Sequence, residues 1–159
     1  MEEHRAWQRL PADVALERAM LGQDPRGHKH DHQYRVSNAA LREAARLAVE
    51  RSTAFFEPET FEPIIAVTRN IQAEVFGLGP MWGYDAAERI AAHRGIVPEK
   101  FVYVQRGALA GARNLGLRVA NGRLRYADLA PEFHVLDAGD VEDFLCVNKH
   151  RLSAAMLGR

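Results

Sequence analysis

The chain has 159 residues, 47% of them hydrophobic, and its 21 Lys and Arg residues balance 21 Asp and Glu residues. This length and composition allow a substantial buried core, while the zero net charge argues against a binder that relies on charge alone. No segment reaches the roughly 18 apolar residues that a membrane span needs, and no signal peptide is visible. Cys146 is the only cysteine, which excludes an internal disulfide, and we expect a cytoplasmic protein.

The first part of the chain is predicted to be a helical arm on a linker. Residues 2–21 carry apolar side chains near helical spacing, and Pro11 is expected to divide the segment because proline interrupts a helix. Residues 22–33 are polar and contain glycine and proline, which is typical of a linker. We therefore expect residues 1–21 to form an N-terminal helical arm, joined by a His-containing linker to a helical domain over 34–159.

Two further helices are predicted in the first half of the chain. Ser37 or Asn38 can cap a helix that runs to about Arg51. Thr60 can cap the next one, whose apolar residues recur with the 3.6-residue period of a helix that has one buried face. This second helix is expected to end in a turn at Gly77.

The segment Gly77-Leu78-Gly79-Pro80 joins that helix to another, which is predicted to run from Trp82 to about His93. Two glycines one residue apart allow the backbone to reverse and to approach another molecule closely. Proline suits the first position of a helix, where its missing N–H is not needed. Because the first N–H groups of a helix are unpaired, the turn is a potential site for an anion such as phosphate.

The C-terminal part of the chain is predicted to combine short strands with helices. Residues 101–104 are β-branched and aromatic, as in a strand, and residues 108–115 form a short helix. Residues 117–124 are centred on an Asn-Gly pair, which favours a β-hairpin. Asp140 can cap a last helix, with another Asp three residues on as in a capping box. The fold class is mainly α, with a short strand or β-hairpin near 101–125.

Charge is distributed unevenly over this part of the chain. The segment from Arg94 to Arg125 contains seven Lys and Arg residues and a single acid, Glu99. The following stretch to Phe144 contains six acids and no Lys or Arg. Such asymmetry can mark a local basic surface in a neutral protein, or the acidic segment can fold back and neutralise the basic one.

The run over residues 77–90 resembles a helix-hairpin-helix motif, in which two glycines alternate with apolar residues and an alanine follows four residues after the second glycine. Gly77-Leu78-Gly79 matches the hairpin, and Gly83 stands where the family usually has a close-packed alanine. The resemblance implies a compact helical domain built around a helix-hairpin-helix at 61–93. It also implies that the hairpin N–H groups bind nucleic-acid phosphates.

The resemblance extends to helix-hairpin-helix DNA glycosylases, whose downstream layout is similar to residues 97–106 and 113–117 here. Lyase-type members of that class carry a nucleophilic lysine in the hairpin, and Met81 stands at that position. The catalytic aspartate that the class requires would fall near Tyr103. A glycosylase needs such a carboxylate or lysine to stabilise or trap the sugar intermediate. The chain therefore resembles the scaffold without its chemistry, and we expect no glycosylase or lyase activity.

The function predicted from these patterns is non-catalytic binding of a nucleic-acid backbone, with DNA as the expected partner. Phosphate contacts of this kind support affinity rather than sequence choice. The predicted binding residues are Gly77, Gly79, Met81, Arg89, Arg94, Lys100 and Arg106. The alternative for the same turn is a structural or protein-facing role, because Met81 and Trp82 are apolar where the family usually has cations or hydroxyls; the protein would then be an interaction adaptor.

A second alternative is an enzyme of unknown reaction. The segment His28-Lys29-His30-Asp31-His32 contains imidazoles and a carboxylate, which are good ligands for a divalent metal. A site could combine this segment with Tyr103, Gln105 and Arg106. The other interpretation of His28, His30 and His32 is a solvated polar linker. We favour the linker, and no cofactor is expected.

Overall fold

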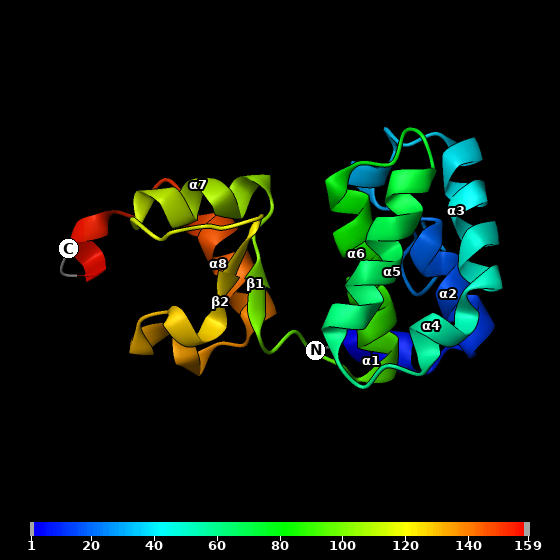
Figure 1. Cartoon of the computed structure of the whole chain (residues 1–159), viewed down its shortest axis with the longest axis horizontal. Helices are drawn as coiled ribbons and strands as arrows, with labels where there is room; N and C mark the ends of the chain where they lie inside the picture. The colour runs from blue at the N-terminus through cyan, green and yellow to red at the C-terminus, as the bar shows by residue number, and fades with distance from the viewer. Residues whose placement is uncertain (1, 158–159) are drawn as a thin grey trace. The chain divides into compact units, whose positions relative to one another are not determined.

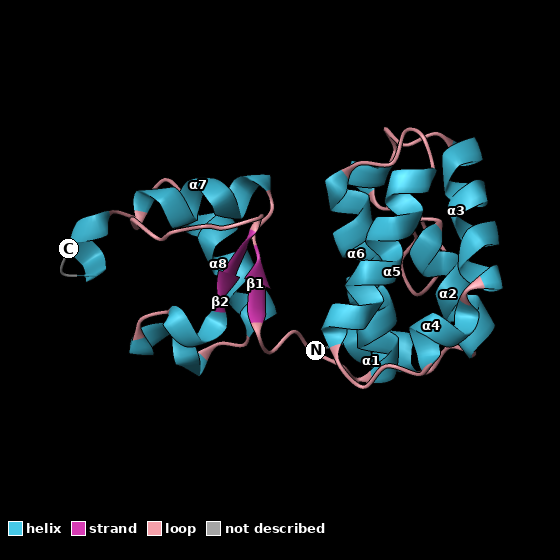
Figure 2. Ribbon diagram, in the orientation of Figure 1, coloured by secondary structure: helices cyan, strands magenta, loops and turns pink. Residues whose placement is uncertain are grey.

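The computed structural model describes residues 2–157, apart from the side chains of His32 and Leu157. The described chain is mainly helical with one small antiparallel sheet, as the sequence predicts (Figures 1 and 2). It divides into two compact units, unit 1 over Met1–Ile96 and unit 2 over Val97–Arg159. This division differs from the expected arm, linker and domain, because the helices before residue 22 belong to unit 1.

Unit 1 is a bundle of helices of different lengths. Its helices are α1 (Glu2–Gln8), α2 (Ala12–Met20), α3 (Asn38–Glu50), α4 (Ser52–Phe56), α5 (Phe61–Glu74) and α6 (Pro80–Arg94). The break between α1 and α2 lies at Pro11, as predicted, and α4 is a short helix that the sequence pattern did not indicate. Helix α6 is buried along most of its length because α1, α2 and α5 pack around it.

The predicted N-terminal arm is part of the core of unit 1. The Trp7 side chain of α1 and the Leu16 and Met20 side chains of α2 are fully buried. The Trp82 indole N–H of α6 donates a hydrogen bond to the Met20 carbonyl oxygen at 3.0 Å. Burial of these large side chains stabilises α1 and α2 on the bundle, which explains why they do not form a separate arm.

The starts of α3 and α5 test the predicted helix caps. The Ser37 hydroxyl accepts a hydrogen bond from the Ala40 N–H, so Ser37 rather than Asn38 caps α3. Thr60 is the residue before α5, as predicted, but its side chain makes no cap hydrogen bond. Helices α5 and α6 then pack closely, and the Thr68 hydroxyl donates to the Gly83 carbonyl oxygen at 2.7 Å.

Unit 2 is a small sheet with two helices. Its elements are β1 (Phe101–Tyr103), α7 (Arg106–Asn114), β2 (Arg123–Arg125) and α8 (Ala138–Asn148), with short 3₁₀ turns at Tyr126–Asp128, Pro131–Val135 and Ala154–Leu157. The predicted strand and short helix are therefore present. The predicted turn at Asn121-Gly122 also forms, but the strand that follows it pairs with β1 rather than with residues 117–120. Only the bridge between Ala120 and Arg123 closes the expected local hairpin.

The core of unit 2 lies between the sheet and its helices. Val102 and Leu124 face each other across the two strands and are buried with side chains of α7 and α8, including Leu145. The cap of α8 lies earlier than the predicted Asp140. The N-cap is Asp137, whose carboxylate accepts a hydrogen bond from the Asp140 N–H at 2.8 Å. Cys146 is half-buried in α8, where it faces Gly107 of α7.

Candidate functional site

The turn between α5 and α6 is narrow and open at its tip. Gly77 has a φ of +94°, which is the left-handed region that favours glycine, and it lies beside Ala40 in the first turn of α3. A β-carbon placed on Gly79 would have no atom within 4 Å. The Gly79 position therefore faces open space rather than a neighbouring helix.

Helix α6 begins at this open turn. Gly79 is the N-cap and Pro80 the first helical residue, and none of the described side chains caps this end of α6. The Trp82 N–H donates to the Gly79 carbonyl oxygen at 3.0 Å, which closes the first turn. Pro80 has no N–H and the Trp82 N–H is bonded, so among the described residues the backbone donors left at the start of this 15-residue helix are those of Gly79 and Met81, at the positive end of the helix dipole.

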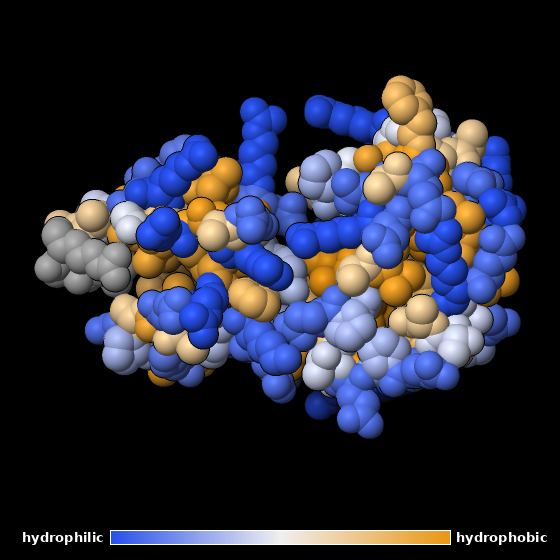
Figure 3. Space-filling view, in the orientation of Figure 1, coloured by the Kyte–Doolittle hydropathy of each residue, from blue (hydrophilic) through white to orange (hydrophobic). Residues whose placement is uncertain are grey.

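Apolar side chains flank the turn. Phe76 is 100% exposed and Met81 is 42% exposed, whereas Trp82 is buried in the core of unit 1. Met81 was among the predicted site residues, but Phe76 was not. Its position directly before Gly77, as a large apolar residue at a turn, could have indicated it. Figure 3 shows hydrophilic and hydrophobic side chains intermixed on the visible face.

A cationic and aromatic pair lies beside the start of α3, at the same end of unit 1 as the turn (Figure 1). The Lys29 ammonium donates to the Val36 carbonyl oxygen and to the Asn38 side chain, both at 3.1 Å. It also lies 5.6 Å from the centre of the exposed Tyr34 ring. No sequence pattern groups Lys29 with Gly77, because only the fold brings the start of α3 beside the α5–α6 turn.

Arg89 is placed inside unit 1 and is 8% exposed. Its Nη2 lies 3.9 Å from Asp85 Oδ2, and the same carboxylate oxygen accepts from the Gln33 amide at 2.9 Å. Burial lowers the pKa of the Arg89 guanidinium, and the carboxylate of Asp85 acts in the opposite direction. These contacts join the segment before α3 to α6, so the predicted phosphate contact of Arg89 does not fit its position.

Arg94 also has a structural partner. Its guanidinium Nη1 donates to the carbonyl oxygens of Phe55 and Pro58. These carbonyls lie at and just beyond the end of α4, where helix carbonyls lack intrahelical partners. The Arg94 side chain therefore holds the α4–α5 connection in place through Nη1, and its phosphate contact stays a prediction.

Lys100 and Arg106 are exposed, but both belong to unit 2 and not to the unit that carries the hairpin. The N-terminus of α7, where Arg106 is the first residue, already has an acidic neighbour. The Gln105 N–H donates to Glu142 Oε1 of α8 at 3.3 Å. A phosphate-binding turn after β1 would have to compete with this carboxylate.

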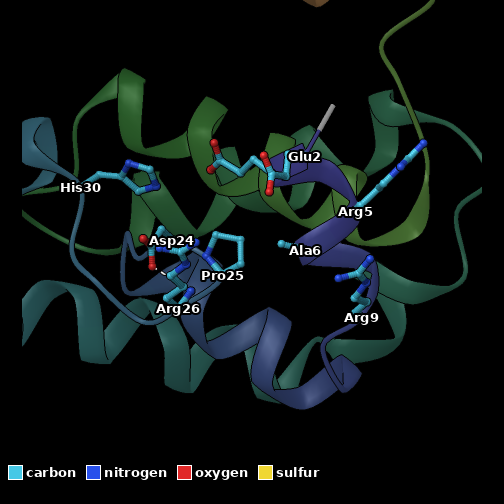
Figure 4. Close-up of a pocket in the computed structure, with 9 residues that line it drawn as sticks. Glu2, Arg5, Ala6, Arg9, Asp24, Pro25, Arg26 and His30 are labelled. Atoms are coloured by element: carbon cyan, nitrogen blue, oxygen red, sulfur yellow. Dashed lines mark hydrogen bonds between the residues drawn. The ribbon is translucent and has the colours of Figure 1, made fainter.

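Of the histidine segment, His30 lines a surface hollow of about 950 Å³ beside α1, together with Asp24, Pro25 and Arg26 (Figure 4). His30 lies opposite Glu2, whereas Arg5 extends away from it. His28 is exposed and its Nδ1 lies 3.4 Å from Asp24 Oδ2. Both acidic and basic side chains line the hollow, so its charge favours neither an anion nor a cation.

A metal at this segment remains a prediction. Among the side chains that the structure describes, no group of three or more His, Cys, Asp or Glu residues is arranged to hold a metal ion. The His32 side chain lies outside that description. The enzyme hypothesis also requires Tyr103, Gln105 and Arg106, which belong to unit 2, while the histidines belong to unit 1.

Comparison of the chain with protein-family models, with curated proteins and with solved structures gave no match. Within the described residues, every helix is too short or too polar to cross a bilayer.

Proposed function

We propose that this protein binds the phosphate backbone of nucleic acid, with DNA as the first candidate, through a helix-hairpin-helix formed by α5 and α6. The observation that carries the proposal is the open turn at Gly79. No atom lies within 4 Å of a β-carbon at this position, and no described side chain caps the helix that begins there. A phosphate oxygen can reach such backbone donors where a bulkier turn would exclude it.

The N–H groups at the start of α6 would donate to one phosphate group, and the helix dipole would add to that attraction. Lys29 supplies a cation near the start of α3, which lies against Gly77. The exposed Phe76 and Met81 side chains would lie along the apolar parts of the sugars. Contacts of this kind position a protein on nucleic acid without selecting a base sequence.

Substitution of Gly79 is the sharpest test of this proposal. Gly79 has φ −94° and ψ 169°, which other residues adopt without strain, and a larger side chain would have room. Gly79→Asp places a carboxylate over the N–H groups, so we expect it to abolish binding of a labelled DNA duplex measured by fluorescence anisotropy. Gly79→Ala is the matched control, because it adds a β-carbon without charge, and it should keep binding within about threefold of the unmodified protein.

Salt dependence provides the second readout. The logarithm of the association constant should fall linearly with the logarithm of salt concentration, with a slope of roughly −1 for each phosphate contact that a cation makes. Thermal unfolding checks that both variants are folded at the assay temperature: because Gly79 is the N-cap of α6, the Asp variant should be at least as stable as the unmodified protein and the Ala variant less stable by up to about 1 kcal/mol. Equal binding by the Asp and Ala variants, with both folded, would show that the hairpin does not bind the phosphate backbone.

Protein binding by the same turn is the second candidate, and the full exposure of Phe76 favours it. Large apolar side chains are enriched at the centres of protein interfaces. Phe76→Ser removes the apolar surface without disturbing a packed contact. If the turn binds protein, the labelled DNA duplex will bind the unmodified chain and both Gly79 variants alike, or will bind none of them.

A further inference from the structure

A groove in unit 2 is lined by arginines and one aromatic ring. It has a volume of about 520 Å³ and lies beside the β1–β2 sheet and the turn that precedes β2. We call it the arginine groove and define it by Phe101, Arg118, Asn121, Arg123, Arg125 and Asp128. None of these residues takes part in the hairpin of unit 1, so the groove is a separate feature of the molecule.

The turn at the edge of the groove is held rigidly. Asn121 and Gly122 have φ angles of +51° and +70°, the combination that a tight hairpin turn requires. Ala120 and Arg123 exchange two backbone hydrogen bonds of 3.1 Å across this turn. The Val104 N–H also donates to the Gly122 carbonyl oxygen at 2.9 Å. The backbone that carries Arg123 is consequently fixed from both sides.

Arg123 is oriented by the ring of Phe101. The guanidinium carbon lies 4.2 Å from the ring centre, which is a close cation–π contact. Phe101 lies on β1 and pairs with Arg125, so one face of the sheet brings Phe101, Arg123 and Arg125 together. A guanidinium that lies over a ring keeps its N–H edges available, and these edges match the geometry of phosphate oxygens.

The groove has an excess of positive charge. Arg118 is exposed, and no described residue forms an ion pair with it. Arg125 Nε lies 3.8 Å from Asp128 Oδ2, and Asp128 is the only acid among the residues that line the groove. The acidic segment that follows the basic segment in the sequence therefore neutralises at most one of the three arginines here.

The basic surface extends beyond the arginine groove. A second hollow of about 390 Å³ is lined by Arg113 of α7 and shares Leu117 with the first. Four arginines thus line two adjacent hollows in unit 2. Arginines spread along a surface in this way suit successive phosphate groups of one strand, with the same chemistry open to a smaller phosphorylated compound.

We infer that the arginine groove of unit 2 is a phosphate-binding site, separate from the hairpin, in which Arg118, Arg123 and Arg125 bind phosphate oxygens. The ligand is a phosphate-bearing molecule, either a nucleic-acid strand or a small compound. Asp128 competes with the ligand for Arg125. This inference does not depend on nucleic-acid binding by the α5–α6 hairpin.

The test compares charge variants of the full chain by fluorescence anisotropy. The probe is a labelled oligothymidylate of about 16 nucleotides, the upper end of the usual site size. Arg118→Gln and Arg125→Gln should each weaken binding roughly tenfold at about 50 mM salt, since one cation–phosphate contact is lost. Asp128→Asn should tighten binding, because it frees Arg125 from its ion pair. Arg151→Gln is the matched control: it removes an exposed arginine of the same unit outside the groove.

Pyrophosphate distinguishes the two sources of phosphate. If the groove binds a nucleic-acid strand, the oligonucleotide will bind in an Arg118-dependent manner and pyrophosphate will displace it poorly. If the groove takes a small compound, pyrophosphate will bind in calorimetry, Arg118→Gln will remove that binding, and the oligonucleotide will not bind.

The inference is overturned if Arg118→Gln and Arg125→Gln bind both probes as Arg151→Gln does. Repeating the series on the Gly79→Asp background separates this site from the hairpin. Loss of duplex binding there, with the Arg118 dependence intact, identifies two independent sites. Thermal unfolding of each variant shows whether it is folded.

Discussion

Gly83 and Gly111 lie inside helices at close helix contacts, but their surroundings differ. A β-carbon on Gly111 of α7 would lie 2.1 Å from the Leu145 carbonyl oxygen of α8. A β-carbon on Gly83 of α6 would lie 2.5 Å from Gln72 Oε1, the far end of a flexible side chain. The first neighbour is backbone and cannot move without separating two helices, whereas the second can rotate away.

Alanine substitution should therefore act in opposite directions at these two positions. We expect Gly111→Ala to reduce the free energy of unfolding by about 3 kcal/mol, because overpacking forces α7 and α8 apart. Gly83→Ala should be neutral or should stabilise by up to about 1 kcal/mol, since alanine favours a helix over glycine. Urea unfolding followed by far-ultraviolet circular dichroism checks both. A large loss of stability in Gly83→Ala would mean that Gln72 is fixed in place.

Arg89 and Arg94 illustrate a limit of sequence reasoning at the same scale. Both follow the predicted hairpin, and both are cations on or at the end of a helix, as a phosphate contact would be. Arg89 instead faces Asp85, and Arg94 binds carbonyl oxygens near the end of α4. The local sequence does not show which side of α6 is buried, because α6 has packed neighbours on several sides.

At the scale of elements, the start of α8 collects acidic residues. Asp137 caps the helix, and Asp140 and Asp143 follow within two turns. Loss of hydration raises the pKa of the Asp143 carboxyl, and repulsion from Asp140 and Asp137 adds to this. A raised carboxyl pKa means that the folded state disfavours the charged form.

Asp143→Asn should consequently stabilise unit 2 at neutral pH. Above the raised pKa, Asp143 is charged in the folded protein and its full destabilising effect is present. As the pH falls through the raised pKa towards the unperturbed value of 3.8, the carboxyl is protonated and this effect is lost. At pH 7 we expect a rise in Tm on the order of 1–2 °C, which corresponds to a few tenths of a kcal/mol for a surface charge. Below the unperturbed pKa the difference should vanish.

Glu132→Gln, which removes an exposed carboxylate elsewhere in unit 2, serves as the control for that measurement. Melting curves at several pH values compare both variants with the unmodified protein. A stabilisation that persists at low pH would contradict the electrostatic explanation.

At the scale of the whole molecule, both units have buried hydrophobic residues of their own. Unit 2 has a core around Val102 and Leu145, and both tryptophans, Trp7 and Trp82, are buried in unit 1. Tryptophan fluorescence therefore reports on unit 1, while circular dichroism reports on the helices of both units.

We expect the two units to unfold in separable steps. Gly111→Ala destabilises unit 2 and should shift part of the circular dichroism transition to lower urea, while the tryptophan transition stays within error of the unmodified protein. Separate domains commonly break two-state behaviour in this way. Coincident shifts of both signals would show that the chain unfolds as one cooperative unit.

Much of the secondary structure could be predicted from local sequence. The helical period of residues 61–74, the Ser37 cap and the Gly-x-Gly-Pro turn act over a few residues, and each appears in the structure near its expected place. Hydrogen bonding and backbone preference at these positions depend on near neighbours, which the sequence displays directly.

Tertiary packing decided the features that connect distant residues. It placed α1 and α2 in the core of unit 1 and paired β2 with β1. It also buried Arg89, brought the start of α3 beside Gly77, and gathered the arginines of the groove around Phe101. The physical reason is that burial and cross-chain contacts depend on which surfaces meet, and a one-dimensional pattern shows only that a surface is apolar or charged.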